Sequence, residues 1–197
     1  MSAHEHLEHA EHAEHASHGG SKKIALLISV LALFLAFSET LGKSAQTTAI
    51  TDNVTANDLW SFFQAKTIRM TVLNTAAEQM QIEADRAPDA DTKARLAKTI
   101  GDWKALVARY DDDAQSKEGR KQLSERAKEA EHSRELALAR YHHYEFASAA
   151  FQIGIVLASA QVITTMALLG WLSGALGVIG FIFTGIGLWA PHAVHLF

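Results

Sequence analysis

The chain has no cysteine and only two prolines among its 197 residues. The missing cysteine excludes disulfide bonds, thiol catalysis and metal sites built on thiolates, and it leaves the redox compartment open. The scarcity of proline favours long, uninterrupted helices, because proline breaks a helix interior. The net charge of −4 is small, and basic residues are interleaved with acidic ones, so the sequence predicts no stripe for nucleic acid.

The motifs of common enzyme classes are also missing from the sequence. It contains no P-loop, no GxSxG, no HExxH and no dinucleotide fingerprint. Its acidic residues are spread around helical segments that lack a pocket. We therefore expect a protein that is not an enzyme, with no catalytic or cofactor-binding residue.

Charged residues are nearly absent from three windows, and this pattern separates membrane spans from a region that faces water. Three transmembrane helices are predicted, at residues 22–42, 146–169 and 174–190. The first is interpreted as an uncleaved signal anchor. The last two are expected to be joined by a turn at residues 170–174. Small residues in these two spans favour close packing of their backbones.

Three polar side chains fall inside the predicted spans: Glu39, Gln152 and Gln161. Amides in lipid usually face other helices, where they find hydrogen-bond partners, and lining a pathway is the alternative. Glu39 fits a carboxylate at the level of the lipid headgroups. An ion or proton ligand within the membrane is the alternative for Glu39.

Residues 43–145 are predicted to form an extramembrane helical hairpin or coiled-coil stalk between spans 1 and 2. A heptad pattern runs from Leu59 to Ala84 in steps of four and three residues, which is typical of a helix seam against a partner helix. Thr55–Asp58 resembles a capping box, and Pro88 predicts the break between the two arms. The region 111–119 is expected to be a bend, a skip or a loop.

A fold-back at Pro88 pairs positions whose numbers sum to about 177, and this register places Lys66 near the acidic run that starts at Asp111. We interpret four residues as an ion-paired layer that sets the register of the hairpin: Lys66, Asp111, Asp112 and Asp113. A polar cation site is the alternative.

Residues 1–21 form a tail rich in histidine and glutamate, with histidine at every third position from His6 to His18. We interpret it as a solvated low-complexity segment without a cofactor. Loose binding of Zn²⁺, Cu²⁺ or Ni²⁺ is the second interpretation, and a pH-responsive tail is the third. The candidate metal ligands are His6, His9, His12, His15 and His18.

Three stretches resemble a known group of small bacterial membrane proteins that is classed as a domain of unknown function. They are the His/Glu-rich start, the segment 58–66 and the run from Phe146 to Pro191. Members of that group have an N-terminal span, a helical middle region and a C-terminal pair of spans. The resemblance implies the same architecture here and no particular activity. It also marks Gln64 and Lys66 as part of a family-like motif.

We therefore expect an all-α protein of the bacterial inner membrane that acts as a non-enzymatic assembly or scaffold component. Its expected surroundings are membrane lipid and either further copies of the chain or a membrane-protein partner. An oligomeric transport or channel component is the alternative, and sensing through the tail is another. The expected interaction residues are Trp60, Phe63, Gln64, Lys66 and Arg69. Lys22 and Lys23 before the first span favour a cytoplasmic N-terminus and a periplasmic stalk.

Overall fold

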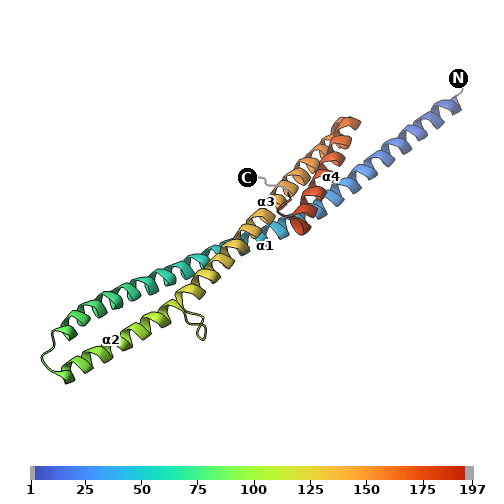
Figure 1. Ribbon diagram of the computed structural model, residues 1–197. Coiled ribbons are helices and arrows are strands. Elements are labelled where there is room, and N and C mark those ends of the chain that lie inside the picture. The colour runs from blue at the N-terminus through green and yellow to red at the C-terminus, as the bar shows by residue number, and fades with distance from the viewer. Residues whose placement is uncertain (1–2, 194–197) are drawn as a thin grey trace. The chain divides into compact units, whose positions relative to one another are not determined.

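The computed structural model describes the backbone of residues 3–193 and the side chains of residues 22–193. The described chain contains four helices and no strand: α1 (Ala3–Asp85), α2 (Ala90–Asp111), α3 (Arg120–Thr164) and α4 (Ala167–Trp189). Figure 1 shows these helices and the short links between them. The predicted all-α class is confirmed.

Three of these helices are long and apolar enough to cross a membrane. They are α1, in which the apolar part lies near the N-terminus, and then α3 and α4. This agrees with a multi-pass membrane protein. The predicted start of a helix at Thr55 is wrong, because α1 runs through this position without a break. The Thr55 hydroxyl donates to the Thr51 carbonyl oxygen four residues earlier, at 2.9 Å, instead of capping a helix.

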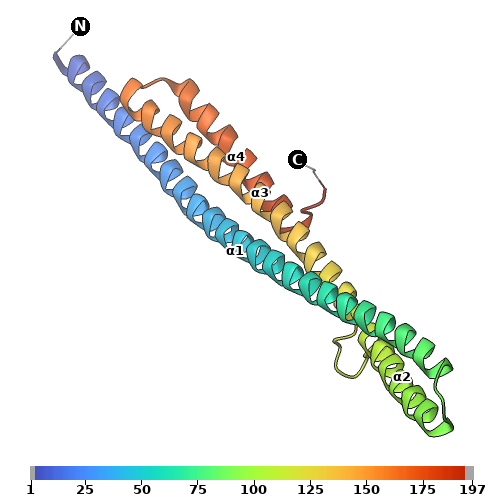
Figure 2. The same ribbon diagram turned by 90° about the vertical axis from the view of Figure 1, so that its left-hand side faces the viewer.

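The chain divides into two units, one made of residues 1–48 and 136–197 and the other of residues 49–135. In the first unit, α1 packs on the hairpin of α3 and α4, and these two helices lie side by side in both views (Figure 2). Its core is Leu31, Ala147 and Phe151, which are almost completely buried. Small residues of α3 and α4 admit these large side chains, because a Cβ atom on Gly180 would lie 2.6 Å from the Phe151 ring.

The turn between the two C-terminal helices lies at Thr165 and Met166, so the predicted turn at residues 170–174 is wrong. The break falls inside the segment 146–169 that was predicted as one span. Thr165 adopts a left-handed conformation with φ of 58°. Its amide donates to the Gln161 carbonyl oxygen at 2.8 Å and closes the last turn of α3. Gly170 and Gly174, which bound the predicted turn, lie inside α4. Gly170 allows close contact with the Gln161 side chain, whereas a Cβ atom on Gly174 would meet nothing within 4 Å.

The second unit is a helical hairpin. Its first arm is the end of α1, and its second arm is α2 followed by the start of α3. The break at Pro88 is confirmed, and the Asp89 carboxylate caps α2 by accepting from the Thr92 amide at 2.8 Å. Residues 112–119 link α2 to α3, as expected. The predicted seam is buried inside this unit: Leu59 packs with Leu123 and Ala127, and Ala77 and Ala84 pack with Ile100.

Candidate functional site

A groove of about 480 Å³ lies between α1 and α3 in the first unit, next to the apolar part of these helices. Small residues line it on both sides, including Ser38, Gly42 and Ser148. Ser38 is completely buried, and its hydroxyl donates to the Tyr144 carbonyl oxygen at 3.0 Å. This bond fixes α1 against α3 at the groove.

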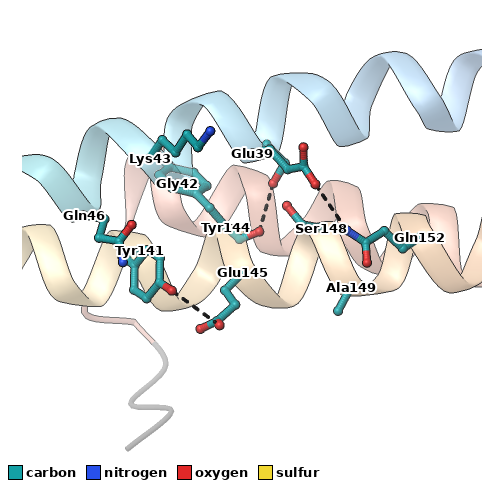
Figure 3. A pocket seen from close by; sticks show the side chains of 11 residues that line it. Glu39, Gly42, Lys43, Gln46, Tyr141, Tyr144, Glu145, Ser148, Ala149 and Gln152 are labelled. Carbon is teal, nitrogen blue, oxygen red and sulfur yellow. Dashed lines mark hydrogen bonds between the residues drawn. The ribbon is translucent and has the colours of Figure 1, made fainter.

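The rim of the groove is polar and exposed, and Figure 3 shows it from close by. The amide nitrogen of Gln152 donates to Glu39 Oε1 at 3.2 Å. The Tyr141 hydroxyl donates to Glu145 Oε1 at 3.4 Å. Lys43 also lines the groove, and it forms no ion pair with any carboxylate of residues 22–193. The rim therefore offers two held carboxylates and one unpaired ammonium group.

Glu39 and Gln152 come together as partners, whereas the third predicted polar residue of the spans lies elsewhere. Gln161 packs with its amide against Gly170 on α4, and its Oε1 is buried without a hydrogen-bond partner in the described chain. The spacing in sequence could not show this pairing, because it depends on how α1 lies against α3.

The sequence pattern did not point to a buried histidine in the first unit. His143 is only 1% exposed and stacks on Phe183, with ring centroids 6.2 Å apart. Its Nε2 lies 3.0 Å from the Pro191 carbonyl oxygen. Since that oxygen only accepts, Nε2 carries the proton, and His143 holds the segment that follows α4 in place.

The expected interaction residues of the hairpin are divided between its interior and its surface. Trp60 is half-buried, and its Nε1 donates to Glu131 at 2.8 Å, while its ring meets Phe63 edge to face. Gln64 and Arg69 are exposed. Lys66 is only 7% exposed, with Nζ 4.8 Å from the centre of the Tyr110 ring and 5.1 Å from that of Phe62.

The position of Lys66 beside Tyr110 agrees with the predicted register of the hairpin, but the predicted ion-paired layer is wrong in its partners. The π faces of the two rings receive the ammonium group, and Lys66 forms no ion pair with a carboxylate of the described side chains. Asp111 pairs instead with Arg120 at 2.8 Å, and Asp112 with Lys121 at 3.2 Å. These basic residues begin α3 and therefore lie next to the acidic link.

The acidic link between α2 and α3 is ordered by hydrogen bonds to Asp113. This carboxylate accepts from the Ser116 amide at 3.1 Å and from Arg109 at 3.0 Å. These bonds, with the Ser116 amide first, lower the pKa of Asp113 from its ordinary value near 3.8 to about 2. Hydrogen bonds from Gln122 and Lys121 also lower the pKa of Asp112. Both groups are therefore charged at neutral pH.

An exposed apolar stripe follows α1 on the face opposite its buried seam. We define the outer stripe as Val54, Ile68, Val72 and Ile82, which are between 53 and 63% exposed. Their spacing fits a heptad, like that of the buried seam, but shifted by two positions. Two positions correspond to about 200° around a helix, so the two stripes lie on opposite faces. Sequence reasoning found the buried seam and missed this one.

No group of three or more potential metal ligands occurs among the described side chains. The candidate ligands of the tail, His6, His9, His12, His15 and His18, lie outside the side chains that the structure describes, although their backbone belongs to α1.

A comparison with protein families matches residues 20–190 to the family described as Domain of unknown function (DUF4337). The chain therefore belongs to this family, as the resemblance of the sequence implied. Comparisons with curated proteins and with solved structures give no match.

Proposed function

We propose that this protein is a non-enzymatic membrane protein that self-assembles through its helical hairpin. The outer stripe of α1 is the observation that supports this function. Soluble proteins seldom leave a row of large β-branched side chains uncovered at heptad spacing, and such rows usually mark an interface. The buried seam that the sequence pointed to is already used within the chain, and so it is not available to a partner.

A second copy of the same chain is the partner that the stripe fits best. Two copies inserted into one membrane with the same topology run parallel, so that the stripe of one copy meets the same stripe of the other about a two-fold axis. The four residues of the outer stripe carry no charge. The other positions of the same heptad are Asp58, Ser61, Ala65, Thr75 and Gln79, and Asp58 is the charged residue among them.

Asp58 distinguishes this arrangement from docking to a basic partner. It is exposed and falls on the heptad of the outer stripe, four residues after Val54. In a parallel pair it faces the Asp58 of the other copy, and like charges at such a position are destabilising. Removal of this charge should therefore strengthen self-association, whereas it would weaken binding to a basic partner.

We further propose that the hairpin is a stalk outside the lipid, with the three apolar helices as its anchor. The support is the composition of residues 49–135, which carry most of the charged side chains. We place the N-terminus in the cytoplasm and the hairpin in the periplasm of a bacterial inner membrane. This orientation follows from Lys22 and Lys23 directly before the first apolar run.

The test is the mass of the full chain in detergent and in lipid nanodiscs, measured for the wild type and for stripe variants. Ile68→Glu and Val72→Glu place a carboxylate on the outer stripe and should raise the dissociation constant of the dimer at least about tenfold. Asp58→Asn should lower it.

Ala105→Glu is the matched control, because it adds the same charge at an exposed position of α2, outside the stripe. It should leave the mass unchanged. A wild type that is monomeric at all concentrations, or stripe variants that associate like the wild type, would contradict self-assembly. Weaker association of Asp58→Asn would indicate a basic partner instead.

A further inference from the structure

The groove between α1 and α3 has the chemistry of a site for a zwitterionic headgroup. Two carboxylates and one ammonium group line it, from Glu39, Glu145 and Lys43. A ligand that carries one positive and one negative charge complements both signs at once. The tyrosine hydroxyl and the side-chain amides of the rim add neutral donors and acceptors.

The held geometry of the carboxylates favours an ammonium group with N–H donors. Gln152 engages Oε1 of Glu39, so Oε2 of Glu39 can accept from a ligand. Tyr141 engages Oε1 of Glu145, and Oε2 of Glu145 lies 3.8 Å from His142 Nδ1, which is too long for a hydrogen bond, so this oxygen can also accept from a ligand. Charge-assisted hydrogen bonds of this kind are stronger than neutral ones. A quaternary ammonium group lacks the N–H donors and would lose these bonds.

Lys43 provides the complementary half of the site. It has no carboxylate partner among residues 22–193, although two glutamates line the same groove. An ammonium group on a flexible stem is a common phosphate binder. The small side chains of Ser38, Gly42 and Ser148 leave room for a headgroup beside it.

Next to the groove, on the side of the apolar parts of α1 and α3, apolar side chains can contact the acyl chains of a lipid. Phe37 precedes Glu39 on α1, and Ile153 follows Gln152 on α3, and both side chains are about half exposed. Because α1 leaves its apolar run at this point and α3 enters its own, both residues lie on the apolar side of the groove. A ligand with a polar head and an apolar tail can therefore contact both regions.

We infer that this groove binds a headgroup that carries both a primary ammonium and a phosphate, as in phosphatidylethanolamine. The site does not depend on self-assembly, because all of its lining residues come from one chain.

The test is native mass spectrometry of the full chain released from nanodiscs that contain equal amounts of phosphatidylethanolamine, phosphatidylcholine and phosphatidylglycerol. Phosphatidylethanolamine should be retained in preference to the other two lipids. Glu39→Gln and Glu145→Gln should each reduce its retention roughly tenfold, since each removes a charge-assisted bond. Lys43→Met should reduce retention of all three lipids, because each carries a phosphate.

Glu129→Gln, which changes an exposed carboxylate of α3 in the other unit, is the matched control and should retain lipid like the wild type. Glu39→Asp keeps the charge and should restore most of the binding, which separates a loss of ligand from a loss of folding. Calorimetric titration with soluble phosphoethanolamine shows whether the ligand is a lipid or a soluble compound with the same headgroup. Binding of this compound as tight as that of the lipid would support the site with a soluble ligand. Equal retention of all three lipids, or variants that bind like the wild type, would overturn the inference.

Discussion

At the scale of single residues, two glycines of α4 differ sharply in the side chains that surround them. A Cβ atom on Gly180 would lie 2.6 Å from Cε1 of the buried Phe151 ring, whereas a Cβ atom on Gly174 would meet nothing within 4 Å. Both residues lie on α4, and both have the same intrinsic helix propensity. The packing role of a glycine is therefore a property of its neighbours, and the two positions form a natural pair for experiment.

Gly180→Ala should destabilise the packing of the spans by about 1–3 kcal/mol, because the added methyl group forces the Phe151 ring to move within a filled core. Gly174→Ala should be neutral or slightly stabilising, since alanine is the better helix former. The measurement is the unfolding of the full chain in mixed micelles of a mild detergent and dodecyl sulfate. Equal stability of the two variants would contradict the packing assigned to Gly180.

At the scale of elements, the link between α2 and α3 is held by a charged aspartate. The hydrogen bonds of Asp113 lower its pKa to about 2, below the ordinary value near 3.8. A carboxyl group whose pKa is lower in the folded state than in the unfolded state stabilises the folded state at every pH above its unfolded-state pKa. This stabilisation is lost as the pH falls to the folded-state pKa. The order of this link should therefore weaken between a pH of about 4 and a pH of about 2.

The measurement for this link is the hydrogen-exchange protection of the Ser116 amide, which donates to Asp113, corrected for the intrinsic pH dependence of exchange. Protection should fall as the pH is lowered through this range in the wild type. In Asp113→Asn it should change little with pH, because the residue no longer titrates. A pH dependence that survives this substitution would show that another group controls the link.

The hairpin was predictable because its signals are local. Pro88 and the following aspartate mark the break, and the heptad phase places Lys66 beside Tyr110. The partners of the acidic link were not predictable, because residues at the start of α3 compete with Lys66 and lie closer. The turn at Thr165 was not predicted because it contains neither glycine nor proline. The nearby Gly170, where a turn was expected, lies in α4 and packs against Gln161.

The candidate sites were harder to predict than the fold, since each one depends on contacts between distant segments. The pairing of Glu39 with Gln152 joins residues 113 positions apart. The outer stripe is visible in the sequence as a second heptad, but α1 carries two such patterns. Only the packing of Leu59 on Leu123 shows which of them is already covered within the chain.

At the scale of the whole molecule, the number of helices that cross the membrane determines on which side of it the two termini and the hairpin lie. In the proposed topology, in which all three helices cross the membrane, the N-terminus and the C-terminus lie on opposite sides, and the hairpin lies on the side of the C-terminus. Because the chain has no cysteine, single introduced cysteines report this topology without a background.

Cysteines placed at Ala87 and at Ala193 should react with a membrane-impermeant maleimide added outside intact cells, and a cysteine at Lys22 should react only after lysis. The reason is the cytoplasmic preference of the two lysines before the first apolar run. The cysteine-free chain is the blank. Labelling of the Lys22 variant alone in intact cells would reverse the topology, and labelling of all three would contradict an odd number of spans.

The threonines of α1 that follow its apolar run have a consequence for bilayer thickness. Thr40, Thr47, Thr48 and Thr55 each donate their hydroxyl to a carbonyl oxygen four residues earlier in the same helix. Their polar groups are thus satisfied without water, which lowers the penalty for their entry into the headgroup region. A slightly thicker bilayer can therefore cover one further turn of α1 at a modest cost while the long Lys43 side chain keeps its ammonium group among the headgroups. The charged Asp52 limits a deeper entry of α1.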